Sequence, residues 1–205
     1  TDLPTSNDAS IASIEILVPF TVDERDPPIP GQEPQVAVAS ISEHYPEVMG
    51  IRVVSGRSFS ILDNAESAPV IMVNEALVRR HFPDQNPIGQ RLTISYAGSV
   101  SREIVGVLED VRPRGYESEP RVEAYFPLAQ IPSGSITYVV KTVLDPAQMA
   151  LPVQQAIWSV NPTQSVWGAR TVRDLLWDWM KQRNFNSVLL IAFALLALAL
   201  SAIGV

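Results

Sequence analysis

Cysteine is absent from the 205-residue sequence, so disulfide frameworks, thiolate metal sites and cysteine nucleophiles are all excluded. Histidine occurs only twice, as His44 and His81, and neither has a second histidine three or four residues away, as zinc-binding helices require. The glycine-rich loops that bind nucleotides are also missing, as is the nucleophile turn of α/β-hydrolases. These absences predict no cofactor, no metal and no catalytic residue.

Charged residues make up 18% of the sequence, below the roughly 25% typical of soluble domains, which indicates a globular part joined to a more apolar one. The net charge of −7 is concentrated at the N-terminus. Residues 1–60 hold nine acids and three arginines, a balance of −6, against 13 acids and 12 bases in the remainder. Because an acidic surface without a basic stripe repels a phosphate backbone, we expect no nucleic-acid binding.

The longest apolar run covers residues 185–205, which read FNSVLLIAFALLALALSAIGV and contain no charge. At 1.5 Å per residue, a helix of this length spans about 30 Å, the hydrocarbon thickness of a bilayer. Because the run is apolar on every side, we predict a transmembrane helix rather than a buried core helix. Small residues recur along it and favour close packing with other membrane helices.

A connecting helix is predicted for residues 171–184, immediately before this run. Thr171 is a suitable N-cap, and neither glycine nor proline interrupts residues 171–203. One continuous helix of about 50 Å could therefore lead from the soluble part into a membrane. Lys181 and Arg183 flank the run, and the positive-inside rule taken alone would place the soluble part in the cytoplasm.

The rest of the sequence alternates short strand and helix patterns, separated by clusters of proline, glycine and polar residues. Irregular interleaving with several hairpins predicts an α+β fold with mixed or antiparallel sheets and packed helices. Strands or extended segments are predicted over residues 11–18, 35–41, 50–59, 69–73, 90–96, 101–111, 136–142 and 164–169. Helices are predicted over 42–50, 74–82 and 146–160, with a break at Pro152, and residues 21–34 are expected to form an exposed irregular loop.

The stretch VNEALVRRHFPDQNPIGQRL holds the densest group of potential acid–base residues. His81 and Glu75 are the best candidate pair, yet residues six apart on a helix point about 120° away from each other. Glu75 is better placed to pair with Arg79, four residues further on. We therefore favour a strand–helix–strand scaffold element, with Asn74 as the helix N-cap, over a catalytic site.

Asp110, Arg112 and Arg114 follow a predicted strand, a position at which functional loops often lie. A structural salt-bridge network among these residues is the favoured interpretation. The alternative is a membrane-tethered hydrolase that uses Glu75, His81 or Asp110.

A series of motifs occurs in a specific order: IRVVSGRSF, PVIMVNEALVRRHFPDQNPIGQRL, REIVGVLEDVR, VEAYFPL, and YVVKT followed by DP. This series resembles the MacB-like periplasmic core domain that ABC-transporter permeases carry. The tail RNFNSVLLIAFALLALALSAIGV resembles the opening helix of an FtsX-like permease domain. The resemblance covers residues 36–205. One departure is Pro46, where the family usually has an aromatic residue, and a proline there weakens the helix expected over 42–50.

The resemblance implies a fragment of a multi-pass permease in the cell (inner or plasma) membrane. Residues 1–170 would form the extracytoplasmic MacB-like domain without its N-terminal part, 171–184 a stalk helix, and 185–205 a transmembrane helix. Residues 1–184 would then lie outside the cytoplasm, which overrides the topology that Lys181 and Arg183 suggest.

The resemblance also implies the partners and the mode of action. A separate ABC ATPase subunit or domain would hydrolyse ATP, a second permease copy would complete a homodimer, and a periplasmic adaptor is a further partner. The chain itself would be non-catalytic, and its long helices would carry ATP-driven motion to the outer domain for export or mechanotransmission. A single-pass extracytoplasmic sensor or binding domain is the remaining alternative.

Overall fold

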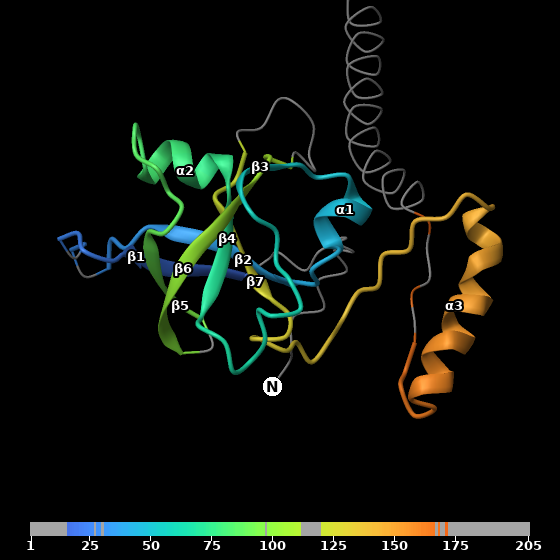
Figure 1. The fold of residues 1–205 in the computed structure, drawn as a ribbon. Helices are drawn as coiled ribbons and strands as arrows, with labels where there is room; N and C mark the ends of the chain where they lie inside the picture. The colour runs from blue at the N-terminus through green and yellow to red at the C-terminus, as the bar shows by residue number, and fades with distance from the viewer. Residues whose placement is uncertain are drawn as a thin grey trace, which may run out of the picture. The chain divides into compact units, whose positions relative to one another are not determined.

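The computed structural model describes residues 16–26, 28–29, 31–96, 98–111, 120–166, 168 and 171. The chain divides into two compact units, residues 1–140 and residues 141–205, and each is described by itself. The described part of the first unit is a seven-stranded sheet with two short helices (Figure 1). Its strands are β1 (Ile16–Val22), β2 (Gln35–Ile41), β3 (Val53–Gly56), β4 (Val70–Asn74), β5 (Arg91–Ser95), β6 (Ser99–Leu108) and β7 (Glu123–Pro127). Its helices are α1 (Tyr45–Met49) and α2 (Glu75–His81).

Six of the strands form a closed hydrogen-bonded ring. The sheet order is β3-β6-β4-β7-β2-β1-β5, and β5 also pairs with β6, which joins the two ends of that series. The long strand β6 makes closure possible, because residues 99–103 pair with β5 while residues 103–108 pair with β4. Strand β3 pairs with the C-terminal part of β6. Two pairings, β2–β7 and β4–β6, are parallel and the others antiparallel, so the predicted mixed sheet is confirmed, and few helices accompany it.

Alternate residues of the strands face two separate apolar clusters. The larger cluster receives side chains from all six strands of the ring, among them Phe20, Leu92 and Phe126, so it fills the enclosed side. Helix α2 adds Leu77 to this cluster, and Phe82 after the helix joins it. The smaller cluster lies on the outer side of β2, β4, β6 and β7. Strands β4 and β7 are buried on both faces, which explains their continuous apolar sequences.

Four predicted elements of this unit are confirmed within one residue, namely those at 35–41, 69–73, 74–82 and 90–96. The elements predicted at 42–50, 50–59 and 101–111 are present but differ by up to three residues at their ends. Asn74 caps α2 as expected, since its side-chain oxygen accepts a hydrogen bond from the backbone N–H of Leu77. Pro46 does not prevent α1, because it lies in the first turn, where a helix does not need the missing N–H. The first strand differs: β1 continues to Val22 because residues 20–22 pair with β5, so the expected loop starts two residues later.

Residues 136–142 are not a strand, contrary to the prediction. Ile136, Tyr138 and Val140 have the alternation of a strand, yet their side chains are exposed, and no strand in the described ranges pairs with them. A strand needs a hydrogen-bonded neighbour, and alternation alone does not supply one. Residues 164–166, part of another predicted strand, are also outside any strand.

The second unit contains α3 (Pro146–Val160). This helix runs through Pro152, so the predicted break is wrong. Proline removes one backbone hydrogen bond, to the carbonyl of Gln148, and Gln148 is exposed enough for water to replace it. None of the described helices is long and apolar enough to cross a bilayer. Apart from Thr171, the predicted stalk and transmembrane helices at 171–184 and 185–205 lie outside the described residues.

Gly106 is expected to be essential for the stability of the first unit. A Cβ atom there would lie 2.2 Å from the backbone oxygen of Arg57 and 2.9 Å from Cε of Met72, where the pairing of β4 and β6 shifts register. Gly106→Ala should lower the free energy of unfolding by about 2–3 kcal/mol, the scale of overpacking in a dense core. Gly134→Ala is the matched control, because its Cβ would meet nothing within 4 Å. Equal unfolding midpoints of the two variants in urea would contradict this expectation.

Candidate functional site

Asn74 connects three elements at the end of β4. Its side chain is 1% exposed. Its oxygen accepts hydrogen bonds from the N–H of Leu77 at 3.1 Å and the N–H of Glu123 at 3.0 Å, and its amide nitrogen donates to the carbonyl of Arg121 at 2.7 Å. The residue therefore joins the start of α2 to the start of β7 as well as capping the helix.

Asp110 supports the same helix from the end of β6. Its carboxylate is buried and accepts a hydrogen bond from the N–H of Ala76 at 2.8 Å and one from Nη2 of Arg79 at 2.5 Å. The predicted pair of Glu75 with Arg79 is wrong, since Arg79 reaches this carboxylate instead and Glu75 accepts a hydrogen bond from the N–H of Asp110 at 3.4 Å. A carboxylate at the first turn complements the helix dipole and competes well for the arginine. Arg112 and Arg114 lie outside the described residues.

His81 is part of a packed corner at the end of α2. Its ring lies edge-on to Phe20, with 5.0 Å between the centroids. Arg25 donates to the backbone carbonyl of His81 at 2.6 Å, and its guanidinium lies 4.9 Å from the ring centroid of Phe82. Burial, then the charges of Arg80 and Arg25, lower the pKa of His81. In the described part of the chain no hydrogen bond or ion pair joins His81 to Glu75, so the geometry gives the candidate acid–base pair no support.

Glu123 on β7 is a buried acidic residue that was not among the candidates predicted from the sequence. Glu123 is 6% exposed, and its carboxylate accepts a hydrogen bond from the hydroxyl of Tyr125 at 2.5 Å. Burial raises the pKa of Glu123, and the hydrogen bond from Tyr125 partly opposes this shift. Burial, with the charge of Glu123, also raises the pKa of Tyr45 to about 12. The sequence could have indicated this contact, because Glu123 and Tyr125 are two residues apart in a strand and their side chains therefore lie on the same face.

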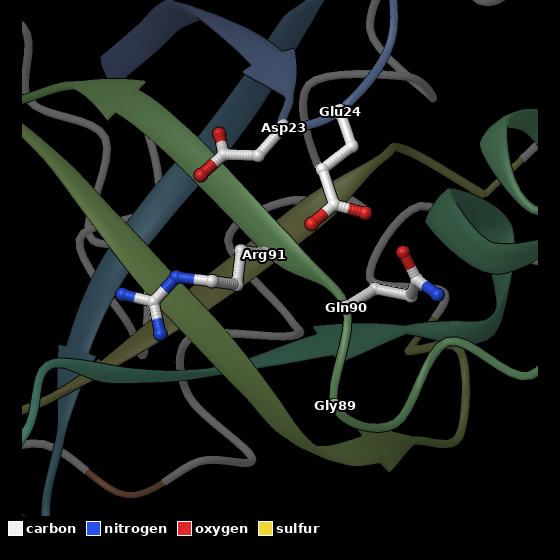
Figure 2. A pocket seen from close by; sticks show the side chains of 5 residues that line it. All are labelled: Asp23, Glu24, Gly89, Gln90 and Arg91. Atoms are coloured by element: carbon white, nitrogen blue, oxygen red, sulfur yellow. The ribbon is translucent and has the colours of Figure 1, made fainter.

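One shallow hollow of about 110 Å³ lies between the end of β1 and the start of β5, lined by Asp23, Glu24, Gly89, Gln90 and Arg91 (Figure 2). Its charged groups do not converge, since Figure 2 shows the guanidinium of Arg91 pointing away from Glu24. Arg91 instead donates to Oγ of Ser101 at 2.8 Å, and that hydroxyl hydrogen-bonds Asp23. These polar contacts connect β1, β5 and β6 at the surface.

Metal-ligating residues are dispersed in the described ranges, where no group of three or more His, Cys, Asp or Glu side chains could hold an ion. His44 lies 3.4 Å from Glu43 and 3.8 Å from Glu47, but its side chain is largely exposed. Contacts between exposed side chains of this kind contribute little to stability.

Glu123→Gln should stabilise the first unit at neutral pH and not at pH 4. Because the pKa of Glu123 is raised in the folded state, the unfolded chain loses its proton first, and the wild type loses stability as pH rises above the ordinary glutamate range. Glutamine stays neutral and can still accept from Tyr125. We expect a gain on the order of 1 kcal/mol at pH 7.5. Thermal unfolding from pH 4 to 8 measures it, with exposed Glu66→Gln as control; a gain that is constant with pH would contradict the role of burial.

Comparison with known proteins gives the family. A model of the MacB-like periplasmic core domain matches residues 3–159. The macrolide export ATP-binding/permease protein MacB of Nitrosomonas europaea is 36% identical over 85 residues, which are 41% of this chain and 12% of that protein. The chain thus matches only a small part of this curated relative. The crystal structure of the periplasmic region of MacB from Actinobacillus actinomycetemcomitans has a TM-score of 0.52 at 16% identity, covering 71% of this chain and 63% of that one, so the likeness is one of fold. The chain belongs to the MacB-like periplasmic core domain family, as its ordered motifs had indicated.

Proposed function

We propose that this chain is the extracytoplasmic and membrane-entering portion of an ABC transporter permease subunit that hydrolyses no ATP itself. A separate ATPase subunit or domain would supply the energy, and the chain would convert it into movement outside the membrane. The match of residues 3–159 to the MacB-like periplasmic core domain carries the proposal. The apolar run 185–205 supports the attachment to a membrane.

The proposed organisation has three parts. Residues 1–170 form the extracytoplasmic domain, 171–184 a stalk helix and 185–205 the first membrane helix of an FtsX-like permease domain. Two copies of the permease would associate, and a periplasmic adaptor would bind outside. The parent protein would then lie in the inner or plasma membrane with residues 1–184 outside the cytoplasm.

The described polar residues favour a mechanical role over a catalytic one. Asp110 and Asn74 both satisfy backbone N–H groups at the start of α2, and His81 packs against Phe20. These side chains fix one element to another, which suits a body that moves without changing shape. The closed ring of strands adds stiffness, because no strand of the ring can separate without breaking two sets of hydrogen bonds.

The parent permease, purified in mild detergent, should retain an ATPase subunit or contain an ATPase domain. Affinity purification followed by mass spectrometry and an ATP-hydrolysis assay measures the association. An unrelated membrane protein with the same tag is the control. If no ATPase is found by either route, the coupling mechanism is refuted.

The coupling itself should appear as an ATP-dependent change in the distance between the two copies. Because the chain has no cysteine, Ile61→Cys offers a single labelling position in it, and the Ile61 side chain is 79% exposed. Spin–spin distances should differ between ATP-bound and ADP-bound states. Leu176→Pro should abolish the difference in distance between the two states, because a proline inside the stalk helix would break it at a cost of about 3 kcal/mol or more. Leu176→Ala, the control, should preserve the difference. Identical behaviour of both variants would contradict a stiff stalk.

His81→Ala distinguishes this proposal from a tethered hydrolase. Loss of a general base typically lowers a rate by about 10²–10⁴-fold. We expect the ATP-dependent distance change to persist in His81→Ala, with at most a modest loss of stability from the missing contact with Phe20. Phe20→Leu, which removes the same ring contact from the other side, is the control for that loss. Abolished function in a folded His81→Ala protein would favour the hydrolase.

A further inference from the structure

Arg102 is a cation on the enclosed side of the strand ring. It pairs with Leu92 across β5 and β6, and paired residues of antiparallel strands point to the same face. Leu92 belongs to the interior cluster, so the side chain of Arg102 enters the ring as well. Arg102 is only 7% exposed. A buried arginine is expected to have an acidic partner.

The contacts of Arg102 are neutral. Its Nη1 donates to Oε1 of Gln130 at 3.0 Å, and its guanidinium lies 5.0 Å from the ring centroid of Phe126. Gln130 is itself held in place, since its oxygen also accepts from the N–H of Val70 and its amide donates to Oγ of Ser67 at 3.0 Å. Tyr96 stacks on Phe126, with 5.8 Å between the two ring centroids.

No carboxylate in the described ranges offsets this charge. Burial lowers the pKa of Arg102, and no acidic group raises it. Glu103, the next residue, pairs with Arg91 and so faces the opposite side of the sheet. Removal of a cation from water without a nearby anion is unfavourable. The ring therefore holds an uncompensated positive charge.

The guanidinium lies at the end of the ring opposite α2. Helix α2 follows the last residue of β4 (Figure 1). Gln130, which binds the guanidinium, accepts a hydrogen bond from the N–H of Val70, the first residue of β4. An arginine has five N–H donors, and the hydrogen bond to Gln130 uses one of them. No fully buried side-chain nitrogen among the described residues lacks a partner. The unused N–H groups of Arg102 are consequently those that reach the surface.

We infer that Arg102 forms a binding site for a small oxyanion, such as a phosphate or carboxylate group, at this end of the ring. The planar fork of donors matches two oxygens of one ligand. Gln130 holds the guanidinium from one side, and Phe126 packs against its face.

Thermal unfolding of the whole 205-residue chain in detergent tests this site, with sodium phosphate titrated against sodium chloride at matched ionic strength. Phosphate at ten times its dissociation constant should raise the unfolding temperature by about 3–6 °C more than chloride does. Sodium acetate in a parallel titration distinguishes a carboxylate ligand from a phosphate. Arg102→Met should abolish the specific shift. Arg91→Met should preserve it, because Arg91 is exposed and lies on the outer face.

Two results would overturn the inference. In the first, neither phosphate nor acetate stabilises the wild type beyond chloride, an outcome that needs no variant. In the second, Arg102→Met responds to the anion as the wild type does. If Arg102→Met does not fold, Arg102→Lys decides: loss of the fork should weaken anion binding at least threefold, and unchanged affinity would count against the site.

Discussion

Closure of the strand ring depends on one strand that is long enough to have three neighbours. The first half of β6 pairs with β5, and the second half lies between β4 and β3. Glu103 pairs with both neighbours and marks the change from β5 to β4. The register shift follows it within the β4–β6 pairing, at Gly106, where the backbone of Arg57 lies directly against β6. Both apolar clusters follow from this arrangement, since the ring separates an enclosed face from an outer one.

A few buried polar side chains attach the helix and loops to that ring. Asn74 satisfies three backbone groups, and Asp110 satisfies one backbone group and one arginine. Arg57 and Asp63 form a two-bond ion pair that fixes the loop after β3, with distances of 2.7 and 2.8 Å. In these groups the hydrogen bonds of the side chains serve to hold one element to another.

Local patterns predicted local structure well. The cap at Asn74 depends on neighbours in sequence, and α2 begins beside it as expected. The break expected at Pro152 is a local error, but two other errors come from contacts between distant residues. A strand over 136–142 required a partner that alternation cannot reveal, and the choice of Arg79 between Glu75 and Asp110 required the position of β6. The buried positions of Glu123 and Arg102 depend on register in the same way.

The order in which the ring is assembled has a consequence for how the chain folds. Strand β2 pairs with β7, which follows it at a large distance in the sequence, so that Ala37 lies opposite Glu123. In a chain that is delivered from its N-terminus, β2 can pair with β1 at once but lacks its second neighbour until β7 has emerged. Such long-range pairings fold slowly, and unpaired apolar strands are prone to aggregate in the interval. The hairpin of β5 and β6, with a short connection at Gly98, is the part that can form first and receive the earlier strands.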